Sequence, residues 1–278
     1  MNTGNVDDSD VLSASKDLAA VVILAGGASS RMGTPKATLT LPTGERLLDY
    51  HVRHALALSM TNNNAPIMIA DNERGFTVSS DLSANHPQSP IIHIADYGDS
   101  SRYSQASEEQ KSTEQKADGQ IDTGGALVAI ESALQAVLDL NQSANLQCKQ
   151  SSWLLVISCD SLIPATALWQ KLQLSEIQAT DSQATESETT DIQKIESQTV
   201  DKKVICLTDD SHLYPLLGLY QLNVEPDLKA YIDSGGRRGM QFIKPIVQAV
   251  PFEKNWQHLT NFNTPEEFKR ACASLSDL

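Results

Sequence analysis

Short, uninterrupted apolar runs alternate with amphipathic segments of helical period, and this alternation restricts the fold more than any other feature of the chain. Runs of this kind are typical of strands buried on both faces, as in a parallel sheet. The predicted strands are residues 19–24, 66–70, 91–95, 153–158, 204–207, 215–220 and, at an edge of the sheet, 247–252. The predicted helices are residues 45–60 and 125–140. A further helix begins at Thr264, an N-cap residue followed by Pro265 at the first helical position and by Glu267.

We therefore expect an α/β fold: a single doubly wound, mostly parallel sheet with helices on both faces. With 278 residues, the chain is long enough to bury a sizeable core. Ligands of such sheets bind beyond the carboxyl ends of the strands. The loops after Leu24, Ala70, Ala95 and Ser158 are therefore expected to converge on one site.

Three polar, acidic stretches interrupt the alternation. Residues 1–17, 97–121 and 175–203 carry net charges of −3, −2 and −4, and all three are poor in large apolar residues. Such segments cannot bury enough apolar area to offset the entropy lost on ordering. We expect a disordered acidic tail at 1–17, and surface insertions at about 97–121 and 175–203 of a domain that spans 18–278.

Composition also argues against several classes of protein. A net charge of −14 disfavours nucleic-acid binding, which needs a basic face. The apolar run at residues 18–25 is far shorter than the roughly 18 residues of a membrane span and has no basic flank of a signal peptide. The four cysteines have no C-x-x-C spacing, so we expect neither disulfides nor zinc, and a cytoplasmic location. His51 and His54 are expected on the surface of a helix, without ligand spacing.

A glycine-rich loop, LAGGASSRMGTPK, follows the first predicted strand. Glycines at this place let backbone N–H groups approach a phosphate closely, because no Cβ intervenes. Arg31 and Lys36 add a guanidinium fork and a point charge for phosphate oxygens. The loop is neither a Walker A motif nor G-x-G-x-x-G, because its glycines are differently spaced. The candidate nucleotide-binding residues of the loop are Leu24, Ala25, Gly26, Gly27, Arg31, Gly33 and Lys36.

Two aspartates end predicted strands on the side of the sheet where the glycine loop lies. Asp160 follows the most hydrophobic strand, WLLVIS, and Asp96 follows the third strand. Carboxylate oxygens suit Mg²⁺, which makes Asp160 the best single metal ligand. The alternative for each aspartate is an ordinary turn or helix-capping role.

The glycine loop resembles the signature L-A-G-G-x-S-x-R-M-G-x-x-K of the nucleotidyltransferases that include the molybdenum cofactor guanylyltransferases, the MobA-like family. Three more segments are similar to that family: the strand ending in Cys159-Asp160, the G-R-R-G-M segment at 236–240, and the N-x-N-T-P-E-E segment at 261–267. The resemblance spans residues 19 to about 270. The sequences T-G-G-A-L at 123–127 and A-D-N at 70–72 depart from the family's usual G-P-L-A/G-G and N-x-N.

The resemblance implies a Rossmann-like nucleotidyltransferase fold and an enzyme that transfers GMP from GTP to molybdopterin-bound molybdenum cofactor, releasing pyrophosphate. It also implies Mg²⁺ as cofactor, with Asn263 or Asn261 as a second anchor beside Asp160. Its partners would be GTP, the molybdenum cofactor, and a molybdoenzyme or its chaperone that receives the product, with no nucleic acid and no membrane. The residues that the resemblance makes catalytic are Arg31, Lys36 and Asp160; those at the nucleotide include Asp96 and Asp160; those at the acceptor substrate are Arg237, Arg238, Asn261 and Asn263.

Three alternatives stay open at this point. One is a CTP-dependent molybdopterin cytidylyltransferase, another is a sugar-1-phosphate nucleotidyltransferase, and the third is a non-catalytic nucleotide-binding regulator. The doubled glycine and the N-x-N-T-P-E-E segment favour guanylyl transfer, whereas the wording S-S-R-M-G-T-P-K favours cytidylyl transfer. The presence of Arg31, Lys36 and Asp160 argues against a regulator.

Overall fold

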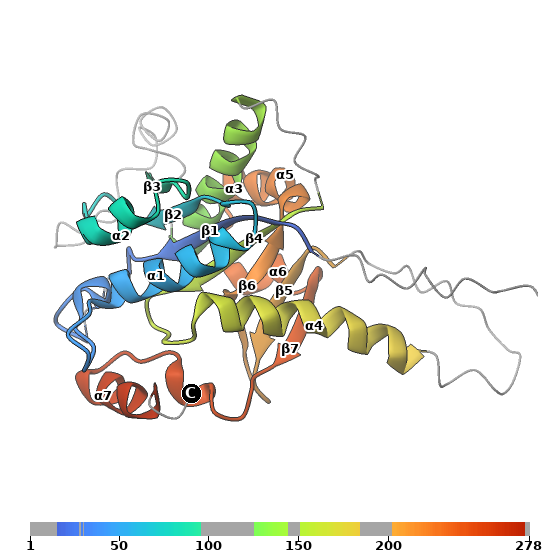
Figure 1. Ribbon diagram of the computed structural model, residues 1–278. Helices are drawn as coiled ribbons and strands as arrows, with labels where there is room; N and C mark the ends of the chain where they lie inside the picture. The colour runs from blue at the N-terminus through green and yellow to red at the C-terminus, as the bar shows by residue number, and fades with distance from the viewer. Residues whose placement is uncertain are drawn as a thin grey trace, which may run out of the picture.

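The computed structural model describes residues 16–27, 29, 31–95, 125–143, 151–183 and 202–275, and of 175–183 the backbone only. These residues form a seven-stranded sheet with helices on both faces (Figure 1). The strands are β1 (Leu18–Leu24), β2 (Ile67–Ala70), β3 (Ile91–Ile94), β4 (Trp153–Ser158), β5 (Val204–Thr208), β6 (Leu213–Gln221) and β7 (Val247–Pro251). The helices are α1 (Leu47–Met60), α2 (Ser80–Asn85), α3 (Gly125–Ser143), α4 (Ala165–Gln183), α5 (Glu225–Asp233), α6 (Gly239–Ile243) and α7 (Pro265–Ser274).

The sheet has the strand order β3-β2-β1-β4-β6-β5-β7. Strands β3, β2, β1 and β4 are parallel neighbours, and β5 and β7 are a second parallel pair. Strand β6 is antiparallel to both of its neighbours, β4 and β5. The predicted doubly wound, mostly parallel sheet is confirmed, and β7 lies at an edge as expected.

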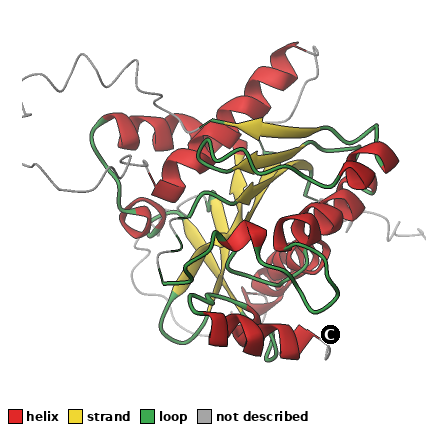
Figure 2. Ribbon diagram, turned by 90° about the vertical axis from the view of Figure 1, so that its left-hand side faces the viewer, coloured by secondary structure: helices red, strands yellow, loops and turns green. Residues whose placement is uncertain are grey.

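Alternate side chains of β1 enter two separate cores, one on each face of the sheet. Val21 and Ile23 pack with buried side chains of α1, α4 and α7. Val22 and Leu24 pack on the opposite face with buried side chains of α3, α5 and α6. Figure 2 shows the strands between these two sets of helices. Burial on both faces explains why the strands are continuous apolar runs.

The chain reverses its direction of travel across the sheet at β1. From β1 it proceeds outward through β2 to β3, and it returns to β4, which pairs with the other side of β1. The carboxyl ends of β1 and β4 therefore flank a topological switch point, where open α/β sheets bind their ligands.

Much of the three acidic stretches lies outside the described residues: 1–15 of the predicted tail, the whole of 97–121, and 184–201 of the second predicted insertion. At the end of the predicted tail, the carbonyl of Asp17 accepts a hydrogen bond from the Trp153 N–H over 2.8 Å. Helix α4 runs to Gln183, so the first residues of the predicted insertion at 175–203 are helical. The helices α2, α4, α5 and α6 were not foreseen in the sequence.

No helix among the described residues has both the length and the apolar character that crossing a membrane requires.

Candidate active site

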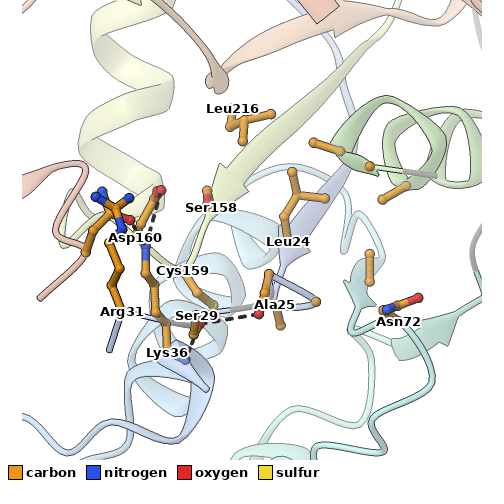
Figure 3. Close-up of a pocket in the computed structure, with 17 residues that line it drawn as sticks. Leu24, Ala25, Ser29, Arg31, Lys36, Asn72, Ser158, Cys159, Asp160 and Leu216 are labelled. Atoms are coloured by element: carbon orange, nitrogen blue, oxygen red, sulfur yellow. Dashed lines mark hydrogen bonds and ion pairs between the residues drawn. The ribbon is translucent and has the colours of Figure 1, made fainter. Parts of the chain in front are cut away.

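A cavity of about 340 Å³ lies at the switch point, within the usual range of small-molecule sites. Its wall combines the end of β1, the glycine loop, the ends of β2 and β4, the start of α3, one residue of β6 and one residue that precedes α7 (Figure 3). The lining residues are Leu24, Ala25, Gly26, Gly27, Ser29, Arg31, Lys36, Ala70, Asn72, Gly125, Ala126, Ala129, Ser158, Cys159, Asp160, Leu216 and Asn263. The loops after β1, β2 and β4 thus converge as predicted.

The cavity has a charged end and an apolar end. Figure 3 shows Arg31, Lys36 and Asp160 together on one side, with Leu216 and Asn72 farther away. The lining side chains from β1, β2, α3 and β6 are small or aliphatic, and the Asn72 amide is a polar side chain on this side of the cavity. Such a site can hold a molecule with an anionic part and a flat, largely apolar part.

Glycine suits the two adjacent positions 26 and 27 for different structural reasons. A Cβ on Gly26 would lie 2.8 Å from Cβ of Asn72, so the close approach of the loop after β2 requires glycine. A Cβ on Gly27 would meet nothing within 4 Å, and Gly27 lines the cavity. A side chain at Gly27 would therefore project into open space that a ligand can use.

A turn at Ser29 fixes the rest of the loop. The Ser29 carbonyl accepts hydrogen bonds from the N–H groups of Met32 and Gly33, over 3.0 and 3.1 Å. Gly33 has a φ of +71°, which suits glycine, and it supports the turn without lining the cavity. The Lys36 N–H donates to Oγ of Ser29 over 3.3 Å, so the start of the 3-10 helix η1 (Lys36–Thr38) is tied to the turn.

Three polar side chains from distant segments meet at the charged end. Nζ of Lys36 donates to Oδ1 of Asn263 over 2.8 Å and lies 3.7 Å from Oδ2 of Asp160. The Asn263 amide donates in turn to the carbonyl and to Oδ1 of Asn261, over 2.9 and 3.1 Å. The sequence prediction that Lys36, Asp160 and Asn263 share one site matches this geometry.

A backbone bridge and a helix cap bring Asn263 to the carboxyl end of β4. Ser161 and Thr260 form an antiparallel bridge, and the Leu162 N–H donates to the Leu259 carbonyl over 2.7 Å. At the start of α7, Thr264 and Glu267 form a reciprocal capping box, which confirms the predicted helix start. Glu267 also accepts a hydrogen bond from the Asn263 N–H over 2.7 Å, so the backbone of Asn263 is fixed.

The turn after β4 contains a cysteine and rests on a histidine. Burial raises the pKa of the Cys159 thiol to about 12, so the thiol stays neutral near pH 7 and is no nucleophile. The expectation that His51 lies on the surface is wrong, because its side chain is fully buried. Burial lowers the pKa of His51 to about 4, with the Ser161 backbone acting in the opposite direction. His51 is therefore a neutral ring packed behind the turn that carries Asp160.

Some predicted site residues lie away from the cavity or outside the described residues. Asp96 lies outside them. Arg237 and Arg238 are exposed and do not line the cavity. The Arg237 guanidinium donates to the carbonyls of Ile232 and Gly236, each over 2.8 Å, next to α6.

Sequence reasoning missed several lining residues, above all Asn72, Ser158 and Leu216. Asn72 and Ser158 could have been found from the rule that loops at the carboxyl ends of parallel strands converge. Leu216 had no such signal, because β6 enters the sheet in the opposite direction.

Comparison with known proteins agrees with this geometry. Residues 21–96, which contain the glycine loop, match the family model described as the MobA-like NTP transferase domain. No curated protein matches the chain.

The fold is similar to that of a solved protein that matches nearly the whole chain. Molybdopterin-guanine dinucleotide biosynthesis protein A from Archaeoglobus fulgidus is 16% identical with a TM-score of 0.52, over 93% of this chain and 99% of that chain. A 4-diphosphocytidyl-2C-methyl-D-erythritol synthase is 9% identical with a TM-score of 0.45, over 94% and 98% of the two chains. The family-model match over residues 21–96 and the fold similarity bear out the resemblance to MobA-like nucleotidyltransferases that was drawn from the motifs.

Proposed function

We propose that this protein is a Mg²⁺-dependent guanylyltransferase that joins GMP from GTP to the molybdenum cofactor and releases pyrophosphate. The observation that carries the proposal is the meeting of Lys36, Asp160 and Asn263 beside the glycine loop, in one cavity at the switch point. Lys36 and Asn263 are 227 positions apart in the sequence, so the fold itself assembles the charged end.

The two ends of the cavity suit the two parts of a nucleoside triphosphate. The charged end would take the phosphates. Because Gly27 has no side chain, phosphate oxygens could approach the backbone of the loop closely there. The apolar end would take the base against Leu216 and the small residues of α3, with the Asn72 amide offering one donor and one acceptor edge. The cavity volume of about 340 Å³ lies in the range of small-molecule sites, to which nucleotide sites belong.

In the reaction, a phosphate oxygen of the acceptor attacks the α-phosphorus of GTP. A new P–O bond forms, the bond from the α-phosphorus to the bridging oxygen breaks, and pyrophosphate leaves with the electron pair. Both reactants and the leaving group are anionic, so the protein's task is to position them and to neutralise charge. Lys36 and Arg31 supply the positive charge, and Arg31 adds a bidentate fork.

The donors at the charged end fit a magnesium ion. Asp160 offers a carboxylate whose side chain is 29% exposed, and Asn263 offers an amide oxygen. No group of three or more His, Cys, Asp or Glu side chains among the described residues could hold a metal, so the ion would share its coordination with substrate phosphates, as Mg²⁺ characteristically does. A bound Mg²⁺ supplies charge neutralisation on the triphosphate oxygens. Asp160 and Asn263 would hold it.

A nucleotide panel tests the proposal. The purified protein is given molybdopterin-bound molybdenum and GTP, CTP, ATP or UTP in turn, and pyrophosphate release is measured with and without the acceptor. We expect acceptor-dependent release with GTP, lost in Asp160→Asn. Acceptor-dependent release with CTP alone would replace guanylyl by cytidylyl transfer, which the S-S-R-M-G-T-P-K wording of the loop favours. The panel is repeated with a sugar 1-phosphate in place of the molybdenum cofactor, and release only with that acceptor would reject the molybdenum cofactor as the substrate.

A further inference from the structure

Lys36 already holds both oxygens that the proposed function gives to the metal. Its ammonium donates to Oδ1 of Asn263 over 2.8 Å and forms an ion pair with Asp160 at 3.7 Å. The amide nitrogen of Asn263 donates to two oxygens of Asn261, and a flip of the amide towards Lys36 would break both hydrogen bonds. Oδ1 of Asn263 is thus presented to whichever cation stands between these residues.

An ammonium and a divalent ion cannot share this place. Mg²⁺ binds oxygen ligands at about 2.0–2.1 Å, which would put it in contact with a Lys36 ammonium that is still bound to the same oxygens. Repulsion between the two cations at such a separation is strong in a partly buried site. The side chain of Lys36 is 14% exposed, so little water screens it.

The side chain of Lys36 can leave while its backbone stays in place. Its N–H is held by Ser29, and its Nζ lies 5.7 Å from the centre of the Phe262 ring. A lysine has a flexible four-carbon stem and a point charge, so rotation of the stem can carry the ammonium towards Gly27. Triphosphate oxygens bound at Gly27 would provide the anionic partner that the ammonium needs there.

Resting on the proposed function, we infer that Lys36 is an internal cation that competes with the metal for Asp160 and Asn263 and is drawn off them by the triphosphate. Metal and nucleotide then bind with positive cooperativity. The triphosphate draws the Lys36 ammonium away from the metal ligands, and the metal releases that ammonium for the triphosphate, so the coupling is reciprocal. Lys36 thereby keeps the metal site closed to divalent ions that arrive without a nucleotide.

Manganese binding without nucleotide tests this inference. Mn²⁺ prefers the same oxygen ligands as Mg²⁺, and its free fraction is measured by electron paramagnetic resonance. Lys36→Met keeps the length of the stem and removes the charge, and we expect it to bind Mn²⁺ at least tenfold more tightly than wild type. Lys36→Arg keeps the charge and should bind as weakly as wild type. Lys171→Met is the matched control, because Lys171 pairs with Glu253 and does not line the cavity.

Two further measurements separate competition from a structural defect. In EDTA, Lys36→Met should bind GTP more weakly than wild type, so that affinity for the metal rises while affinity for the nucleotide falls; a misfolded site would lose both. Adding Asp160→Asn to Lys36→Met should abolish the gained Mn²⁺ binding. Lys36→Gln serves as a second neutral variant if the methionine variant does not fold.

Lys36→Met and Lys36→Gln proteins that bind Mn²⁺ no more tightly than wild type would overturn the inference. Gained Mn²⁺ binding that survives Asp160→Asn would overturn it too, since the ion would then sit elsewhere. Failure of the proposed function is seen in a different experiment, as the lack of pyrophosphate release from any nucleotide. An unchanged Mn²⁺ affinity beside release that depends on Asp160 would reject the inference alone.

Discussion

Replacing Glu131 by glutamine should stabilise the protein at alkaline pH and leave its stability nearly unchanged near pH 4.5. Glu131 lies on α3 with a fully buried side chain, and neither carboxyl oxygen has a donor among the described residues. Burial raises the pKa of this carboxyl from 4.5 to about 7, with the negative charge of Glu225 on α5 acting in the same direction. On α5, Lys229 opposes the shift and Asp233 adds to it.

The sign and size of the effect follow from proton linkage. Because the native pKa lies above the unfolded value, the native state binds more protons between pH 4.5 and about 7, and stability falls as the pH rises through that window. The loss is complete above about pH 7 and amounts to about 3 kcal/mol, at ~1.4 kcal/mol per pKa unit. Glutamine keeps the size of the side chain and has no proton to lose. Glu131→Gln should therefore gain up to about 3 kcal/mol over wild type at pH 8.

Urea unfolding of both proteins at pH 5, 6, 7 and 8 measures this difference. The control is Asp139→Asn, an exposed carboxylate on the same helix, for which the difference from wild type should not grow with pH. Wild-type and Glu131→Gln stabilities that stay parallel from pH 5 to pH 8 would show that Glu131 is ionised in the native protein, against the reasoning from burial.

The site gives three more expectations. Gly27→Val should abolish triphosphate binding measured by calorimetry with a melting temperature within a few degrees of wild type, whereas Gly26→Ala should lower the melting temperature, because the new Cβ would lie 2.8 Å from that of Asn72. Undiminished GTP affinity of Gly27→Val would remove the glycine loop from the phosphate site. Asp160→Asn should lower turnover about 100-fold, equivalent to about 3 kcal/mol, with partial recovery at high Mg²⁺; wild-type turnover at sub-millimolar Mg²⁺ would make Asp160 a turn residue only. His51→Phe should raise the Mg²⁺ concentration for half-maximal turnover about tenfold, since the buried ring packs behind the turn that carries Asp160; a His51→Phe variant with the Mg²⁺ dependence of wild type would deny that support.

Local features of the fold could be read from the sequence. The continuous apolar runs became β1 and β4 because both faces of the sheet are covered by helices, and no other environment suits such runs as well. The helix start at Thr264 was predictable because a capping box is a contact between residues three positions apart. The glycine loop and Asp160 were found because each directly follows a buried strand.

Features that depend on packing between distant segments could not be read in this way. The position of β6 between β4 and β5, antiparallel to both, brings Leu216 to the cavity, and nothing local to Leu216 indicates it. His51 was placed on the surface by its polarity, yet the turn after β4 covers that side of α1. The contact between Lys36 and Asn263 joins residues 227 apart, and the bridge from Ser161 to Thr260 helps to bring them together.

The fate of the two ends of the triphosphate tests the central claim most directly. GTP labelled with ³²P at the α position, and separately at the γ position, is incubated with the protein, Mg²⁺ and the molybdenum cofactor, and the products are separated by chromatography. We expect the α label to enter the dinucleotide cofactor and the γ label to leave in pyrophosphate. Orthophosphate carrying the γ label, or an acceptor carrying it, would mean hydrolysis or phosphoryl transfer and would contradict the assignment of this cavity to nucleotidyl transfer.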